Sequence, residues 1–152
     1  MSKKIRQLVD PSVALTFVPA NINDDSLDAE NFSYHSSIIG IRKLYSEKGL
    51  KFQFPNSDDA QNTLHLHSAD WIAPAIFVTT LYVSQYPDAV SLALSIVANY
   101  ASELFGNDKE SKCQLTIYVE TETGKSRQVD FNGPPDALGD VQKLVREISK
   151  NG

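Results

Sequence analysis

Apolar residues recur every three or four positions in three parts of the chain, which predicts three amphipathic helices. The first begins at Ser36 or Ser37, either of which can cap it, and ends at Gly49, a residue suited to the left-handed conformation that closes a helix. Its predicted apolar face consists of Ile38, Ile41, Leu44 and Tyr45.

The second and third helices are predicted over 87–105 and 134–149. In 87–105 the polar side chains form one narrow stripe, so we expect a central helix that is buried on nearly every side. The third helix opens on two prolines, carries Asp136 and Asp140 near its positive end, and has one apolar face. That face consists of Leu138, Val141, Leu144, Val145 and Ile148.

Alternating apolar and polar residues predict strands elsewhere. A first strand covers 13–18. The alternating segments 50–54 and 63–67 are separated by a cluster of turn residues, which predicts a hairpin. A second hairpin joins 113–120 to 129–131 through a turn that contains glycine.

Residues 70–84 fit either a helix or a strand. Pro74 is unfavourable beyond the first turn of a helix, and the β-branched and aromatic residues of 76–83 favour a buried strand. The length of the uninterrupted apolar run favours a helix, and a helix is our interpretation. The run is shorter than the roughly 20 residues of a membrane-spanning helix, so we expect it in a protein core and not in a bilayer.

The predicted order of elements is typical of an α+β fold. We expect a single domain over 1–152, with an antiparallel sheet built from hairpins and with helices packed largely on one face. Residues 1–12 and 150–152 are expected to be frayed.

Composition narrows the classes of partner. The chain has 152 residues, and 14 Lys and Arg against 19 Asp and Glu give a net charge of −5. This balance argues against nucleic-acid and anionic-membrane binding, which both require basic clusters. No apolar signal-peptide core follows the basic start, so we expect a cytoplasmic protein. The single cysteine, Cys113, falls in an alternating strand, which favours a buried structural thiol.

The sharpest chemical feature is the spacing His65-x-His67-x-x-Asp70. On a strand, residues two apart share a face, so both imidazoles could bind one zinc ion, with Asp70 as an oxygen ligand or orienting group. His35, the remaining histidine, would have to complete a site with three histidines. The alternative is that both histidines lie on the solvent face of an amphipathic strand, and this alternative fits the alternation without a metal.

No other catalytic motif is present in the sequence. There is no Gly-x-Ser-x-Gly elbow and no glycine-rich phosphate loop. Glu120 and Glu122 share a strand face with Tyr118 and are expected to be exposed surface residues. We therefore assign no catalytic residue, and no cofactor is expected unless the histidines bind zinc.

A binding surface is suggested by the middle of the chain. Between Lys51 and Lys109 there is no Lys or Arg, while acidic and aromatic residues are frequent. Tyr82, Tyr86 and Tyr100 are either core residues or part of an exposed aromatic patch suited to protein binding. The residues that we expect to face a basic partner are Asp58, Asp59, Asp70, Trp71, Asp88 and Asp108.

The second half of the chain resembles a known family. The central helix ends in Tyr100-Ala-Ser-Glu-Leu-Phe105 and is followed by Leu115-Thr-Ile-Tyr-Val119, Thr123-Gly-Lys125, Val129-Asp-Phe131 and an amphipathic helix. This order is similar to that of the effector-associated constant component domains of bacterial conflict systems, over residues 37–149. It departs from them at Asn107-Asp108, where the family carries basic residues. The resemblance implies an adaptor that links sensors to effectors, without catalytic residues.

Three hypotheses about function follow. The first is a non-catalytic interaction module, acting as an adaptor, a regulator or an immunity-type protein, possible partners being proteins with a basic face. The second is a small metal-dependent hydrolase that uses His65, His67 and Asp70. The third is a structural subunit of a homo-oligomer, with helix 87–105 partly buried between chains.

Zinc binding separates the first two hypotheses. If the chain is an interaction module, we expect no bound transition metal in elemental analysis of the purified protein, and no change in melting temperature on addition of zinc. A zinc-dependent rise in melting temperature that is lost in His65→Ala would favour the hydrolase instead.

Overall fold

The computed structural model of the chain describes residues 2–23, 31–55, 62–64, 71–106 and 111–151. In chain order the elements are α1 (Ser2–Leu8), β1 (Leu15–Val18), β2 (Ser33–His35), α2 (Ile38–Glu47), β3 (Phe52–Gln53), β4 (Asn62–Leu64), β5 (Trp71–Ile72), β6 (Ala75–Thr79), α3 (Thr80–Gln85), α4 (Pro87–Phe105), β7 (Cys113–Glu120), β8 (Ser126–Gly133), one 3-10 turn (Pro135–Ala137) and α5 (Leu138–Asn151). The mixture of helices and strands agrees with the expected class.

The main sheet contains parallel and antiparallel pairs. β1 pairs with β3 in parallel and with β6 antiparallel, β6 pairs with β7 in parallel, and β7 pairs with β8 antiparallel. Parallel neighbours need a crossover connection, which α2 supplies between β1 and β3, and α3 with α4 between β6 and β7. Two strand–helix–strand units therefore lie antiparallel to each other, and β8 extends the sheet as a hairpin with β7.

The predicted antiparallel sheet of hairpins is therefore only partly right. The pairing of 113–120 with 126–133 is present, but the predicted hairpin of 50–54 with 63–67 is wrong. β3 joins the main sheet beside β1, whereas β4 pairs in parallel with β2 in a separate two-stranded sheet. Alternation identified which segments are extended, but partner choice depends on the whole chain.

The predicted helix over 70–84 is wrong for most of its length. Residues 71–79 form β5 and β6, and only Thr80–Gln85 is helical. β8 occupies one edge of β7, so β5 and β6 follow each other along its other edge. Three residues, 73–75, oppose two on β7, which is a β-bulge. Pro74, which lacks an N–H donor, lies in this bulge, where no ladder hydrogen bond is required of it.

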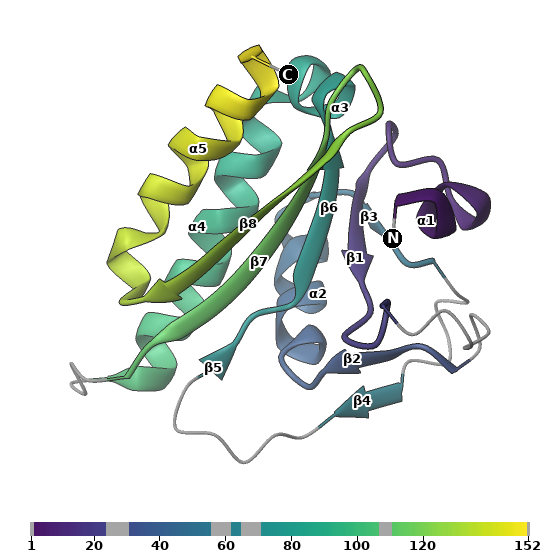
Figure 1. The fold of residues 1–152 in the computed structure, drawn as a ribbon. Helices are drawn as coiled ribbons and strands as arrows, with labels where there is room; N and C mark the ends of the chain where they lie inside the picture. Colours follow the sequence, from purple (N-terminus) through teal and green to yellow (C-terminus); the bar gives the residue numbers. More distant parts are fainter. Residues whose placement is uncertain (1, 24–30, 56–61, 65–70, 107–110, 152) are drawn as a thin grey trace.

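The two faces of the sheet are covered by different helices. Figure 1 shows α2, α4 and α5 behind the sheet and α1 in front of it, near β1. Phe17, Ile76 and Ile117 lie opposite one another in neighbouring strands, and Phe17 stacks on Tyr45 of α2, so these side chains face the three helices. Their chain neighbours point to the other face.

The N-terminal segment is ordered, contrary to the expected fraying of 1–12. α1 forms, its Ile5 is completely buried, and its Arg6 is paired with Glu120 at the end of β7. Thr16 and Phe77, which face the side of the sheet opposite α2, α4 and α5, are also completely buried. α1 therefore covers part of that face. At the other end of the chain α5 continues to Asn151, beyond the predicted end at 149.

An aromatic cluster joins the first strand–helix–strand unit. The rings of Phe17 and Tyr45 are stacked with centroids 5.6 Å apart, and Phe52 and Phe54 lie 5.2 and 5.1 Å from Phe17. Tyr34 of β2 meets Phe54 edge-on at 5.2 Å. Each aromatic pair contributes about 0.5–1.5 kcal/mol beyond the area it buries, so this cluster fixes α2 and the small sheet against β1.

Helix α4 lies between the other helices, as predicted, but the prediction that it is buried on nearly every side is wrong, since Leu92 and Leu104 are 37% and 55% exposed. It packs against α2, α3 and α5, and the burial of its apolar face is accounted for within the chain. Among the described residues, no helix combines the length and the apolar character required to cross a bilayer.

Two helical glycines provide a matched test of this packing. A Cβ on Gly40 of α2 would lie 2.6 Å from the hydroxyl oxygen of Tyr100, while a Cβ on Gly139 of α5 would meet nothing within 4 Å. We expect Gly40→Ala to lower the free energy of unfolding by about 1–2 kcal/mol, since overpacking outweighs the gain in helix propensity. Gly139→Ala should raise it by roughly 0.5 kcal/mol.

Urea unfolding measures both changes. In a Tyr100→Ala background the clash is removed, so Gly40→Ala should become stabilising. A Gly40→Ala variant as stable as the parent would show that the approach of α2 to α4 does not depend on this glycine.

Candidate functional site

Helix α3 lies at the end of the sheet where the parallel strands β6 and β7 both finish. β6 runs directly into α3, and the N–H of Tyr82 donates to the Thr79 hydroxyl, which caps the helix at 3.1 Å. The carboxyl ends of parallel strands are the usual place for ligand sites in sheets with helical crossovers. Among the described residues, several hollows lie along α3; one of them is mainly apolar and another is polar.

We name the apolar hollow the tyrosine cleft. It has a volume of about 430 Å³, within the range typical of ligand pockets. It lies between the turn that ends α2, the segment leading into β1 and the junction of α3 with α4. Its principal lining residues are Val13, Lys51, Tyr82, Tyr86, Asp88 and Leu92.

The two tyrosines are held by the local chain geometry. Tyr86 ends α3 and precedes Pro87, the first residue of α4, and its N–H donates to the carbonyl oxygen of Tyr82 at 2.8 Å. The two rings lie 5.1 Å apart and are tilted by 37°. Burial, together with the neighbouring Tyr86, raises the pKa of Tyr82 to about 12. The Tyr82 hydroxyl is therefore protonated at physiological pH.

Unusually exposed apolar side chains surround the tyrosine cleft. Val13 is 55% exposed, Tyr86 50% and Leu92 37%. Lys51 and Asp88 are both exposed and place one charge of each sign on its lining. Such a cleft can accept an apolar or aromatic side chain and orient it through the polar groups around it.

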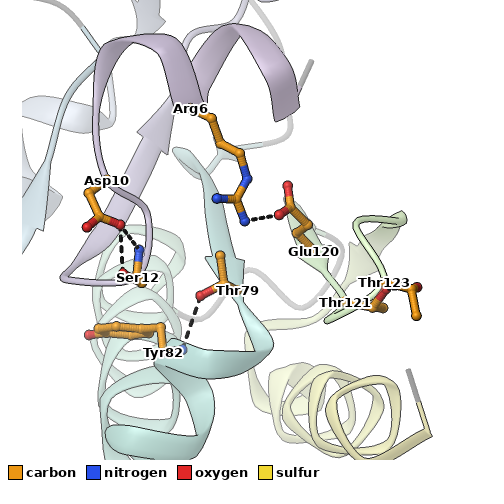
Figure 2. Close-up of polar contacts among 8 residues, drawn as sticks. All are labelled: Arg6, Asp10, Ser12, Thr79, Tyr82, Glu120, Thr121 and Thr123. Carbon is orange, nitrogen blue, oxygen red and sulfur yellow. Dashed lines mark hydrogen bonds and ion pairs between the residues drawn. The ribbon is translucent and has the colours of Figure 1, made fainter.

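The polar hollow lies on the other side of α3 and has a volume of about 540 Å³. Figure 2 shows Arg6 extending from α1 to the carboxylate of Glu120, with Thr79, Thr121 and Thr123 nearby. The Glu120 side chain is 5% exposed and that of Arg6 is 50% exposed. The hydrogen bond to Glu120 raises the pKa of Arg6, which stays charged. The expectation that Glu120 is an exposed surface residue is therefore wrong.

The polar groups of this second hollow satisfy one another. Arg6 donates to Glu120, the hydroxyls of Thr121 and Thr123 are 3.0 Å apart, and Thr79 accepts from the backbone of α3. A buried carboxylate needs a partner of this kind. These paired groups are explained by a structural role, which is to attach α1 to the sheet. We therefore take the tyrosine cleft as the candidate site.

The structure separates the predicted partner-binding residues that it describes. Asp88 lines the tyrosine cleft, beyond the end of β6. Trp71 lies in β5 opposite Cys113, at the start of β7, and packs on Tyr100 with ring centroids 5.5 Å apart. The eight residues of β7 place these two positions at opposite ends of the sheet, about 25 Å apart along the strand. They therefore do not form one surface. Asp58, Asp59, Asp70 and Asp108 lie outside the described residues.

The predicted zinc ligands His65, His67 and Asp70 also lie outside the described residues, so the zinc hypothesis stays a prediction. His35 is described: it ends β2 and lies opposite Leu64, the residue before His65 in the chain. Its Nδ1 atom is buried with no hydrogen-bond partner, and burial lowers its pKa. No group of three potential metal ligands occurs within the part of the chain that the structure describes.

Cys113 is a buried thiol, as its alternating position predicted. Burial raises its pKa to about 12, so the thiolate is negligible at neutral pH and the side chain acts as a small apolar residue.

Sequence reasoning found part of the tyrosine cleft. Tyr82, Tyr86 and Asp88 were all candidates, because they fall in the region without basic residues. Val13 and Leu92 were missed, since each reads as an ordinary apolar position in a predicted strand or helix. Only their exposure in the folded chain distinguishes them. Comparison of the chain with protein-family models, with curated proteins and with solved structures gave no match.

His35 leads to a prediction about pH. Its folded-state pKa lies below the ordinary value of 6.5, so below pH 6.5 the unfolded chain binds a proton that the folded chain excludes. Stability is therefore complete above pH 6.5 and falls as the pH decreases below it. His35→Gln should show a shallower loss between pH 6.5 and 5 than the parent, measured by urea unfolding at several pH values. An unchanged slope would show that protonation of His35 does not oppose folding.

Proposed function

We propose that this chain is a non-catalytic protein-interaction module, whose tyrosine cleft accepts an apolar or aromatic side chain from a partner protein. One observation carries the proposal: three large apolar side chains, Val13, Tyr86 and Leu92, remain exposed around a single cleft. Large apolar side chains exposed together favour an interaction site over ordinary surface. The role suggested by the family resemblance, an adaptor or regulator in a bacterial conflict system, is compatible with such a site.

The energetics support a modest but specific contact. Full burial of a large apolar side chain contributes about 1.5–3 kcal/mol, and each of these three side chains has only part of its surface left to bury. A partner residue that fills the cleft would bury the free part of all three at once. The charges of Lys51 and Asp88 at the rim would then select among apolar partners.

Charge favours a partner that has a basic residue next to the inserted side chain. The chain carries a net charge of −5 and has no Lys or Arg between Lys51 and Lys109, and this region contributes Asp88 to the cleft. Opposite charges at the rim accelerate association and disfavour acidic competitors. We therefore expect the recognised segment to combine an aromatic or aliphatic residue with an adjacent Arg or Lys.

A dipeptide probe tests this proposal directly. We expect N-acetyl-phenylalanyl-arginine amide to shift the amide NMR signals of Tyr82, Tyr86 and Asp88 in a saturable manner. Leu92→Ser should weaken the binding by about fivefold, because it removes one apolar wall without changing any charge. Asp88→Asn should weaken binding of this peptide but have little effect on the corresponding phenylalanyl-glutamine peptide.

Leu104→Ser is the matched control. Leu104 lies on the same helix, is 55% exposed and does not line the cleft. It should leave the affinity unchanged. Equal loss in the two serine variants, or shifts that do not map to the cleft, would contradict the proposal.

A further inference from the structure

The main sheet has one long open edge. β8 pairs with β7 along all eight of its residues, and no other described strand pairs with it. The opposite end of the sheet is β3, which has only two residues. β8 contains no proline and no bulge, two of the features that prevent an edge strand from pairing, and its two charged residues, Arg127 and Asp130, have opposite signs.

The hairpin turn determines which backbone groups of β8 point outward. The N–H of Thr121 donates to the carbonyl of Lys125 at 2.8 Å, so these two residues form a hydrogen-bonded pair. Bonded and non-bonded pairs alternate along an antiparallel ladder, which makes Arg127, Val129 and Phe131 the residues bonded to β7. The backbone groups that point away from the sheet therefore belong to Ser126, Gln128, Asp130 and Asn132.

The same alternation holds on the other edge of β7. The carbonyl of Gln114, which belongs to a non-bonded pair with β8, accepts from the N–H of Ala73 beside β5 at 2.8 Å. This hydrogen bond supports the assignment of inward and outward groups on β8. The side chains of all four outward-pointing residues of β8 are exposed.

The sequence of this edge is complementary to itself. When two antiparallel copies of β8 are aligned with Val129 opposite Val129, Gln128 of each copy lies opposite Asp130 of the other. In the same alignment Arg127 lies opposite Phe131. The first pair joins an amide donor to a carboxylate, and would exchange the bonds that Gln128 makes to Asp130 of its own chain at 3.1 Å for the same bonds between chains. The second pair places a guanidinium beside an aromatic ring. Each opposed pair also shares a face of the sheet, as antiparallel pairing requires.

Neighbouring alignments are less favourable. Centring the pair on Asp130 would place two carboxylates opposite each other, which is destabilising. Centring it on Gln128 would set Arg127 opposite Val129 and lose both complementary contacts. The alignment on Val129 also makes the outward residues the bonded ones, which provides four bonded pairs and about eight backbone hydrogen bonds.

We propose that β8 pairs antiparallel with β8 of a second copy of this chain, about a two-fold axis at Val129. The two sheets then form one continuous sheet, and the interface is isologous. This proposal is independent of the function proposed above. The tyrosine cleft lies on the side of the sheet that holds β1 and β3, so both clefts of the dimer remain open.

Two substitutions of opposite charge at one exposed position test the proposal. Analytical ultracentrifugation over a range of concentrations should show a monomer–dimer equilibrium for the parent chain. Gln128→Lys should tighten the dimer by about tenfold, because each lysine then lies opposite Asp130 of the other copy. Gln128→Glu should weaken the dimer by about tenfold, because two like-charged pairs replace the two polar pairs.

The direction of these two changes identifies the alignment. If Gln128 faced its own copy, both substitutions would introduce like charges and both would weaken the dimer. A parent chain that is monomeric at every concentration, or two variants that change the affinity in the same direction, would overturn the proposal. Circular dichroism should show equal folding of all the variants.

Cross-linking gives a second, independent test. Val129 lies opposite itself in a non-bonded pair, where the Cβ atoms approach closely enough for a disulfide. Val129→Cys should therefore form a covalent dimer under mild oxidation. Ser126→Cys is the control, since the two Ser126 residues would lie about 20 Å apart along the strands. Equal cross-linking of the two variants would contradict the alignment on Val129.

Discussion

The parallel pairing of β6 with β7 is the constraint on which most of this structure depends. Because the two strands run in the same direction, the chain must return along the sheet between them, and α3 with the long central helix α4 makes that return. The core of the second unit forms where α4 covers the sheet. The same return brings α3 to the ends of both strands, where the tyrosine cleft and the polar hollow lie on either side of it.

The tyrosine cleft and the polar hollow lie at the same end of the sheet but differ in whether their lining side chains already have partners. In the polar hollow a nearly buried carboxylate, Glu120, would be costly without a partner, and Arg6 supplies one from α1. Its groups are paired among themselves, and the contact attaches the N-terminal helix to the sheet. In the tyrosine cleft, by contrast, apolar surface on Val13, Tyr86 and Leu92 is left exposed by the rest of the described chain. Burial of this exposed apolar surface against a partner would contribute to binding directly. The polar groups of the other hollow would first have to break the hydrogen bonds that they make with one another.

The proposed dimer and the proposed binding site occupy opposite ends of the strand order. An added strand at β8 would leave the cleft beside β1 and β3 unobstructed, and would hold two clefts in one rigid sheet. A module of that form would bind a partner with two recognition segments far more tightly than one with a single segment, since the second contact becomes intramolecular. This geometry suits an adaptor, which has to bring other proteins together.

The sequence by itself determined the local properties of the chain. Helical periodicity located α2, α4 and α5, and alternation located β1 and the β7–β8 hairpin, because these patterns reflect which side chains each element must bury. It also marked the tyrosines and Asp88 as candidate binding residues. It could not determine which strands pair: β3 lies beside β1 and not β4, and 76–79 is extended and buried on both faces of the sheet. Nor could it show that Ile5 and Arg6 order the N-terminus, or that Val13 and Leu92 stay exposed while similar residues are covered. Pairing, burial and exposure depend on contacts between distant segments, and only the tertiary structure decides them.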